Sequence, residues 1–376
     1  MKLEPYAFPE SEVLRYSQGL PEVLCPVVRL SIPELVSELS NNQEMLRQRL
    51  AHHGALLFRN CGIETVEEFL QVLKSLDIRP CEPGIYYGEV ARPATGAHTM
   101  VATQVPPNFV IGPHNEGDYW YQQPEYLSFF CEATHCLYGQ TPIVNGAKIA
   151  SDLPEELIAK LENRAILTEY VFDSAAANKS LVGEQKRNSW QRMFQTHEKE
   201  AVQGILEARD DVDFSWRDND SLHIQVTTAT FALHPVTGER CFRAMRYCDF
   251  NNVKFMMREL AKNQMPTMRY LSTTIMMHLG LWLASRKWVE REKYSWKTSF
   301  KEGPPLSPQE EKLLTIALFN NSTIFRWHPG DVLLVDNIKV AHGRLNVDSA
   351  RTIHVFMGEY VDQRQIYGQK PVSVEA

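Results

Sequence analysis

The spacing of apolar and polar positions changes along the chain, and it begins as a helical pattern. Apolar side chains recur at helical intervals on both sides of a short extended segment at 55–59. Ser31 has the hydroxyl group typical of a helix N-cap, and Gly54 is typical of a residue that ends a helix. The pattern therefore predicts one helix over 31–53 and another over 64–76.

Short β-rich segments follow this helical part. They lie at 99–105, 126–133 and 166–172, and turn residues separate them. One stretch at 154–163 keeps helical spacing. This zone predicts the strands of a sheet structure with an inserted helix.

The middle of the chain combines two apolar segments with long helical patterns. The segments at 222–233 and 241–247 flank a turn that contains Pro and Gly, so they predict a hairpin that belongs to the same sheet structure. Helical spacing returns at 253–263 and 268–288. We therefore expect helical insertions between the strands of this sheet structure.

Length and composition narrow the classes of function. With 376 residues, 44% of them hydrophobic, the chain can bury a large core. A net charge of −7 disfavours nucleic-acid binding, which needs clustered Lys and Arg. The N-terminus lacks the basic segment and apolar run of a signal peptide, and the longest apolar stretch is too short to cross a bilayer. We expect a cytoplasmic protein whose partners are small molecules, not nucleic acids or membranes.

Three residues carry candidate metal chemistry. His114 and Glu116 form a His-x-Glu motif, and His342 lies far along the chain. Alternate residues of a strand face the same side, so the first two can occupy two sites of one metal face. The third must come from a distant segment that is adjacent in a sheet, as a jelly-roll barrel provides. Two histidines and one carboxylate form the facial triad of iron(II) oxygenases, which leaves positions open for cosubstrate and oxygen.

A second pair of residues indicates a cosubstrate anchor. Arg351 follows the distal histidine, and Thr141 ends the stretch Gly139-Gln140-Thr141. An arginine on the strand after the distal ligand can form two parallel hydrogen bonds to a carboxylate, and a threonine hydroxyl can add one more. The pair predicts a binding site for the far end of a dicarboxylate.

Around these residues the chain resembles the taurine dioxygenase and clavaminate synthase-like family of iron(II), 2-oxoglutarate-dependent dioxygenases. The resemblance extends from His-Gly-Ala-Leu-Leu-Phe-Arg at 53–59 to the segment 351–358. It implies that three residues bind the iron, namely His114, Glu116 and His342. It implies that two residues bind the side-chain carboxylate of 2-oxoglutarate, namely Thr141 and Arg351.

The resemblance also implies a fold. It predicts an α+β protein built on a double-stranded β-helix, the jelly-roll barrel, with a helical N-terminal part and helical insertions. We expect a single dioxygenase domain over 1–376. Its helical part would cover about 1–80, and the barrel with its insertion about 81–376.

Two positions distinguish this chain within that family. Many members have Asp in the first motif, whereas this chain has Glu116, as do clavaminate synthase-like and syringomycin-biosynthesis-like members. That branch mostly oxidises amino acids. Val355 stands where taurine dioxygenase has a second Arg that holds the sulfonate. We therefore expect an amino acid or amino-acid-derived substrate of specialised metabolism and not taurine.

The resemblance implies a reaction that uses iron(II), 2-oxoglutarate and O2. Hydroxylation is the expected outcome, and the sequence leaves desaturation, ring closure, another small carboxylic acid or a substrate attached to a carrier protein open. Two other classes also fit the ligand types. One is a metal-binding barrel without catalysis, and the other is a non-oxidative zinc enzyme.

The substrate pocket is predicted from neighbouring residues. Tyr86 and Tyr119 lie near the first motif in sequence and are candidate walls. Arg243 and Arg246 fall on the strand predicted at 241–247. Because side chains alternate along a strand, at most one of these arginines should point inward, where it would favour a substrate carboxylate.

Overall fold

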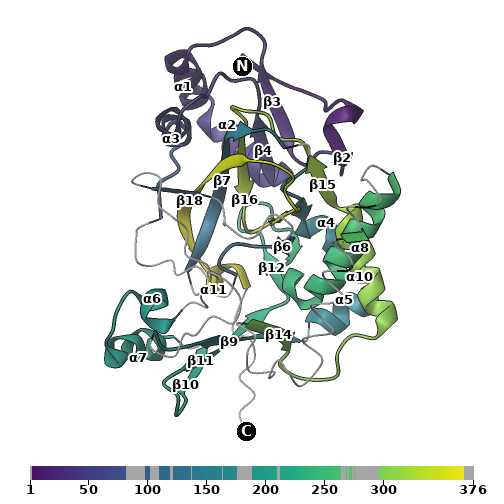
Figure 1. Ribbon diagram of the computed structural model, residues 1–376. Coiled ribbons are helices and arrows are strands. Elements are labelled where there is room, and N and C mark those ends of the chain that lie inside the picture. The colour runs from purple at the N-terminus through teal and green to yellow at the C-terminus, as the bar shows by residue number, and fades with distance from the viewer. Residues whose placement is uncertain are drawn as a thin grey trace.

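The computed structural model describes residues 2–81, 98–101, 110–118, 122–136, 138–162, 164–175, 189–209, 212–263, 268, 271–272, 275 and 296–367. In this part of the chain, helices and strands are both abundant, so the α+β character that the sequence predicts is confirmed. Two large sheets occupy the centre, and helices lie outside them (Figure 1).

The larger sheet has seven strands, of which β1, β3 and β4 come from the N-terminal part of the chain. Its pairs are antiparallel, except that β3 and β4 run parallel. The strand order is β1 (Leu3–Pro5), β3 (Glu22–Pro26), β4 (Ala55–Phe58), β16 (Val332–Asp336), β7 (Gln122–Thr134), β18 (Arg351–Asp362) and β5 (Thr99–Val101).

The smaller sheet has five antiparallel strands and carries both histidines of the predicted metal site. His114 is the last residue of one strand, and His342 is the middle residue of its neighbour. The strand order is β2 (Val13–Arg15), β15 (Ser322–Phe325), β8 (Ile143–Asn145), β17 (Val340–Arg344) and β6 (Ile111–His114).

The N-terminal helices form where the sequence places their caps. The side chains of Ser31 and Glu34 form a capping box at the start of α1 (Ile32–Asn41), and Thr65 and Glu68 do the same for α3 (Val66–Ser75). The predicted 31–53 helix is divided at Asn42, after which α2 (Gln43–His53) continues. Gly54 then ends α2 in the left-handed region at φ 82°.

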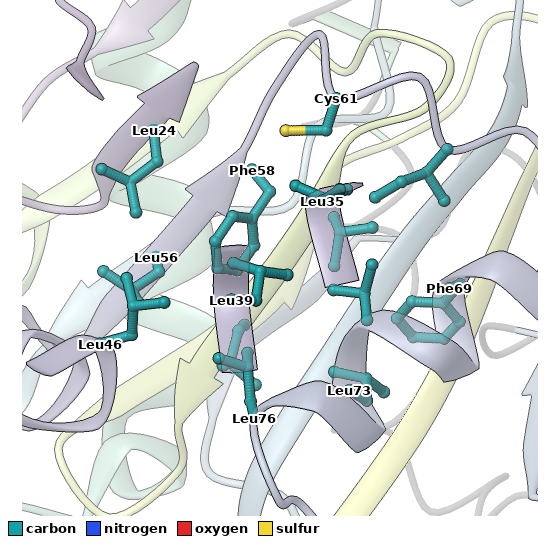
Figure 2. Close-up of a cluster of buried hydrophobic side chains, with 14 of the residues drawn as sticks. Leu24, Leu35, Leu39, Leu46, Leu56, Phe58, Cys61, Phe69, Leu73 and Leu76 are labelled. Atoms are coloured by element: carbon teal, nitrogen blue, oxygen red, sulfur yellow. The ribbon is translucent and has the colours of Figure 1, made fainter. Parts of the chain in front are cut away.

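These helices cover one face of the larger sheet. Figure 2 shows leucines of the helices meeting side chains of β3 and β4. Each fully buried Leu or Phe contributes roughly 1.5–3 kcal/mol relative to exposure. The labelled residues of this cluster are Leu24, Leu35, Leu39, Leu46, Leu56, Phe58, Cys61, Phe69, Leu73 and Leu76.

The opposite face of the larger sheet packs against the smaller sheet. Leu127, Phe129 and Val355 of the former share one apolar cluster with Ile143 and Phe325 of the latter. Among the described residues no strand pairing joins the edges of the two sheets, so they form two facing layers and not a closed barrel. The jelly-roll barrel remains a prediction.

A smaller unit of sheet and helix has its own core. The strands pair in the order β10 (Val212–Trp216), β11 (Leu222–Ala229), β9 (Ala165–Phe172) and β14 (Trp296–Phe300). Two helices, α6 (Trp190–Phe194) and α7 (Lys199–Glu207), add apolar side chains to the core of this sheet. In Figure 1 the unit lies at the end of the molecule opposite α1.

A hairpin forms around the predicted turn at 234–239, but its strands are shorter than predicted and lie in a separate sheet. β11 ends at Ala229, and β12 (Phe231–Leu233) pairs with β13 (Arg240–Phe242) in a separate two-stranded sheet. The chain leaves the strand after Phe242, because the Met245 amide donates to the Arg243 carbonyl and starts the 3-10 turn η2 (Met245–Cys248). The alternation argument for Arg243 and Arg246 therefore does not apply.

The remaining helices cover the smaller sheet and the chain end. They are α4 (Gly146–Asp152), α5 (Glu155–Glu162), α8 (Asp249–Asn263), α10 (Pro308–Asn320) and α11 (Gln363–Tyr367), with the 3-10 turn η1 (Glu10–Glu12). The helices predicted at 154–163 and 253–263 are confirmed by α5 and α8. Most of the predicted 268–288 helix lies outside the described residues. No helix in the described ranges has both the length and the apolar character needed to span a membrane.

Candidate metal centre

The two histidines reach each other through strand pairing. His114 of β6 stands opposite His342 of β17, and the centroids of their rings are 4.5 Å apart. Glu116 completes the group, because one ligand atom from each of the three residues lies within 4.8 Å of the others. The Nε2 atom of His342 is 3.6 Å from a carboxylate oxygen of Glu116. The structure therefore brings together the three residues of the sequence motif.

A turn, and not the strand alternation that the spacing suggests, brings Glu116 to the metal site. β6 ends at His114, so residue 116 lies in a turn and not on the strand. Gly117 closes this turn with φ of 66°, a conformation that side-chain-bearing residues rarely adopt. The expected strand alternation is thus wrong for this motif. The carboxylate is positioned by the turn and by its hydrogen bonds.

The chemistry of the three side chains fits a divalent metal. The Nδ1 atom of His114 is 2.9 Å from the carbonyl oxygen of Gly112. When Nδ1 carries the proton and donates to this carbonyl, Nε2 keeps its lone pair for a metal. Glu116 and His342 are buried, with exposed fractions of 5% and 7%. A buried carboxylate beside two imidazoles is the ligand set of an iron(II) site with open positions.

The predicted cosubstrate anchor forms around one loop. Arg351, at the start of β18, donates from Nη1 to the carbonyl oxygen of Gly139. Gly139 has φ of 101° and lies two residues before Thr141, which is buried. Arg351 therefore contacts the loop that carries Thr141, although the two residues are far apart in sequence.

This end of the site carries buried positive charge. Burial and, to a smaller extent, the nearby charge of Arg344 lower the pKa of Arg351 to about 10. Burial also lowers the pKa of Arg344. Among the described groups that act on Arg351 there is no carboxylate, only Arg344 and two thiols. A guanidinium that is desolvated in this way favours an anionic ligand.

Trp327 belongs to this loop region and was not identified from the sequence. Its indole Nε1–H donates to the Thr141 hydroxyl oxygen at 3.2 Å, and both side chains are buried. Trp327 also packs against Phe325, with ring centroids 5.0 Å apart. A lone aromatic residue after a strand has no pattern that distinguishes a hydrogen-bonding role from core packing, so only the fold reveals this contact.

Of the predicted substrate residues, the structure describes the side chain of Arg243 only. Arg243 is buried, and its Nη1 donates to the carbonyl oxygens of Asn337 at 2.6 Å and Ile338 at 3.0 Å. Its Nη2 donates to a side-chain oxygen of Gln123 at 2.5 Å. These hydrogen bonds hold Arg243 against the protein, and its role as a substrate contact stays a prediction. The other candidates, Tyr86, Tyr119 and the side chain of Arg246, lie outside the described residues.

Val355 lies in the apolar layer next to the metal centre. It stands opposite Phe129 in the β18–β7 pairing and is buried. The Phe129 ring is in turn 5.1 Å from the ring of His342. The position that would hold a second arginine in a taurine dioxygenase is therefore part of an apolar wall here.

Comparison with known proteins identifies a family and several relatives of this chain. The family model of the taurine catabolism dioxygenases, the TauD, TfdA family, matches residues 17–253. The dapdiamide synthesis protein DdaC of Enterobacter agglomerans is 24% identical over 309 residues, which are 81% of this chain and 82% of that protein. A clavaminate synthase-like protein of Arabidopsis thaliana is 22% identical over 338 residues, or 89% and 90% of the two chains. The structure of a taurine dioxygenase from Burkholderia xenovorans superposes with a TM-score of 0.48 at 14% identity, covering 99% of this chain and 97% of that one.

Proposed function

From the premise that the chain belongs to the TauD, TfdA family and is an iron(II)- and 2-oxoglutarate-dependent dioxygenase, we propose that it hydroxylates an amino acid or an amino-acid-derived small molecule in specialised metabolism. The observation that carries the proposal is the meeting of His114, Glu116 and His342 within 4.8 Å. In the same protein Arg351 donates to Gly139, on the loop that carries the buried Thr141. Family membership disfavours a barrel that only binds metal and a zinc enzyme without redox chemistry.

The three side chains are the proposed iron ligands. Bound iron couples the decarboxylation of 2-oxoglutarate by O2, which gives succinate and CO2, to insertion of the second oxygen atom into a C–H bond of the substrate. Glu116 brings one negative charge to the metal, and the two histidines bind as neutral imidazoles. The Gly112 carbonyl keeps the His114 ring in the orientation that directs Nε2 toward the metal.

Arg351 and Thr141 are the proposed anchors of the cosubstrate. The guanidinium of Arg351 can hold the distal carboxylate of 2-oxoglutarate through two parallel hydrogen bonds. The hydroxyl oxygen of Thr141 already accepts the indole N–H of Trp327, so its own proton is available for donation to that carboxylate. Burial strengthens both interactions because water competes less for the charged groups.

The substrate class follows from the chemistry around the metal. The apolar wall at Val355 and Phe129 offers no cation at the position where a sulfonate would be held. Glu116 is the variant of the first motif found in the branch that oxidises amino acids. The relative named for dapdiamide synthesis supports a role in biosynthesis. A different small carboxylic acid, a carrier-linked substrate, and desaturation or cyclisation are the alternative versions of this proposal.

Succinate formation tests the proposal. The purified protein, supplied with iron(II), 2-oxoglutarate and O2, is incubated with single amino acids, carrier-linked amino acids, other small carboxylic acids and taurine. We expect a several-fold rise in succinate with an amino acid or its carrier-linked form, accompanied by a product 16 mass units heavier than the substrate. The variant Glu116→Ala measures the succinate that forms without the proposed carboxylate ligand. Stimulation by taurine alone would contradict the proposed substrate class.

A further inference from the structure

Asn337 connects the proposed carboxylate ligand to the strand that carries the distal histidine. It is fully buried in the turn between β16 and β17. Its side-chain oxygen accepts from the Glu116 amide at 2.8 Å, and its side-chain nitrogen donates to the Glu116 carbonyl at 2.9 Å. The same nitrogen donates to the carbonyl of Pro124 at 2.7 Å. One side chain therefore satisfies both backbone groups of Glu116.

The hydrogen bonds from the Asn337 side chain take the place of strand pairing at Glu116. β6 ends at His114, and its pairing with β17 does not extend to residue 116. The primary amide of Asn337 presents one acceptor and one donor to Glu116, as the backbone of a neighbouring strand would. The side chain of Asn115 adds a third link by donating to the Asn337 carbonyl at 2.8 Å. Because the Glu116 backbone is held on both sides, the direction of its carboxylate is restricted.

The turn that contains Asn337 is itself held by side chains. One carboxylate oxygen of Asp336 accepts from the amides of Ile338 at 3.0 Å and Lys339 at 3.2 Å. Its other oxygen is 2.7 Å from Nε2 of His234. The Nδ1 atom of His234 accepts two backbone amides, so the proton lies on Nε2 and is donated to Asp336.

Two buried cationic side chains also hold this turn. Arg243 binds the carbonyls of Asn337 and Ile338, as described above. The ammonium group of Lys339 donates to the carbonyls of Ala51 at 3.1 Å and His52 at 2.7 Å, at the end of α2. The turn is thus connected to the helical N-terminal part as well as to the metal centre.

We propose that Asn337 is a positioning residue that holds the carboxylate of Glu116 in register with His342, so that one turn sets two of the three metal ligands. Val340 begins β17 directly after this turn, and His342 follows two residues later. This inference rests on the proposed function, because it takes Glu116 and His342 as metal ligands. Asn337 itself touches neither metal nor substrate in this role.

A purely structural role for Asn337 makes a different prediction. A buried asparagine with three hydrogen bonds also stabilises the fold, so its loss lowers thermal stability in either case. Only the positioning role changes how the metal is coordinated in molecules that remain folded. Loss of a partner that orients a metal ligand typically weakens metal affinity by about 10- to 100-fold.

The experiment measures binding of cobalt(II) alone to the full chain, freed of metal by a chelator. Calorimetric titration gives the affinity, and the visible absorption spectrum at saturating cobalt reports the coordination. We compare the native protein with Asn337→Ala, Asn337→Asp, Glu116→Ala and His342→Ala. The Asp variant keeps the acceptor for the Glu116 amide and the side-chain volume but loses both donated bonds.

The matched control is Asn321→Ala. Asn321 is also a buried asparagine, and its side chain donates to Asp152 at 2.6 Å and to the Ala317 carbonyl at 3.0 Å. These partners belong to α4 and α10 and not to the ligand segments. Thermal unfolding of each metal-free variant shows that the comparison is made between folded proteins.

The expected result is a loss of cobalt affinity of about tenfold or more in Asn337→Ala, with a spectrum shifted toward that of Glu116→Ala. Asn321→Ala should keep native affinity and spectrum. Native affinity and spectrum in Asn337→Ala would overturn the inference, and so would an equal loss in the control. Should the Ala variant not fold, the same criteria apply to Asn337→Asp. Native affinity in both Glu116→Ala and His342→Ala would instead refute the proposed metal site.

Discussion

The two ends of the proposed active site are held in opposite ways. On the side of the 336–339 turn, Asn337 and Asp336 form closed sets of hydrogen bonds with neighbouring backbone groups. On the side of the 139–141 loop, Arg351 and Arg344 carry buried positive charge, and no described carboxylate acts on the pKa of Arg351. The first arrangement fixes geometry, because its donors and acceptors are matched within the protein. The second favours binding of an anion, because an anionic ligand would offset the desolvation of the Arg351 guanidinium.

This difference separates the effects expected of variants at the two ends. Changes on the turn side should act on metal affinity and on the stability of the fold. Changes on the loop side should act on the concentration of 2-oxoglutarate that the enzyme requires, with little effect on the metal. A variant that changes metal affinity and the 2-oxoglutarate requirement equally would contradict this division between the two ends of the site.

The largest effect is expected at a metal ligand. His342→Ala removes one of the two imidazoles, so we expect loss of iron(II) binding and of the visible charge-transfer band formed with 2-oxoglutarate. Anaerobic absorption spectroscopy with both components present measures this. His354→Ala is the control, because His354 is a buried histidine that contacts Glu132 at 2.8 Å and lies outside the ligand cluster. A band that persists in His342→Ala would remove this residue from the site.

The next effect is expected at the cosubstrate anchor. Arg351→Ala removes a charge-assisted interaction worth roughly 1.5–3 kcal/mol, so the KM for 2-oxoglutarate should rise about tenfold or more. Iron(II) affinity, measured separately by titration, should stay close to native. Arg351→Lys keeps the charge but loses the two parallel hydrogen bonds of a guanidinium. Its KM for 2-oxoglutarate should lie between those of the native protein and the Ala variant. An unchanged KM in the Ala variant would point to Arg344 as the anchor.

The smallest effect is expected at the indole that orients Thr141. Trp327→Phe keeps most of the packing but removes one hydrogen bond, worth about 0.5–1.5 kcal/mol. The KM for 2-oxoglutarate should rise about two- to tenfold, with kcat and metal affinity near native. Trp190→Phe is matched to it, because that indole donates to the Asp220 carbonyl at 3.1 Å in the four-stranded unit. Equal shifts of KM in both variants would assign the effect to packing.

Family and local structure could be predicted from short stretches of sequence. The capping boxes at Ser31 and Thr65 and the terminating Gly54 involve residues only a few positions apart, and the structure contains them. Such signals depend on backbone conformation and on neighbours within one helical turn. The predicted strand at 241–247 is confirmed only as far as Phe242, because an apolar stretch does not tell whether partners continue beside it.

The sequence by itself determined which chemistry is present: two histidines, one carboxylate and an arginine, in motifs that resemble one family of dioxygenases. It did not determine how Glu116 is held, since its partner Asn337 lies 221 residues away. It also left Arg243 as a substrate candidate, whereas the fold engages that side chain with backbone carbonyls of the same turn. The physical reason is that a spacing motif specifies the types of side chain, while their partners depend on how distant strands and turns pack. That packing is set by the whole core and not by any single segment.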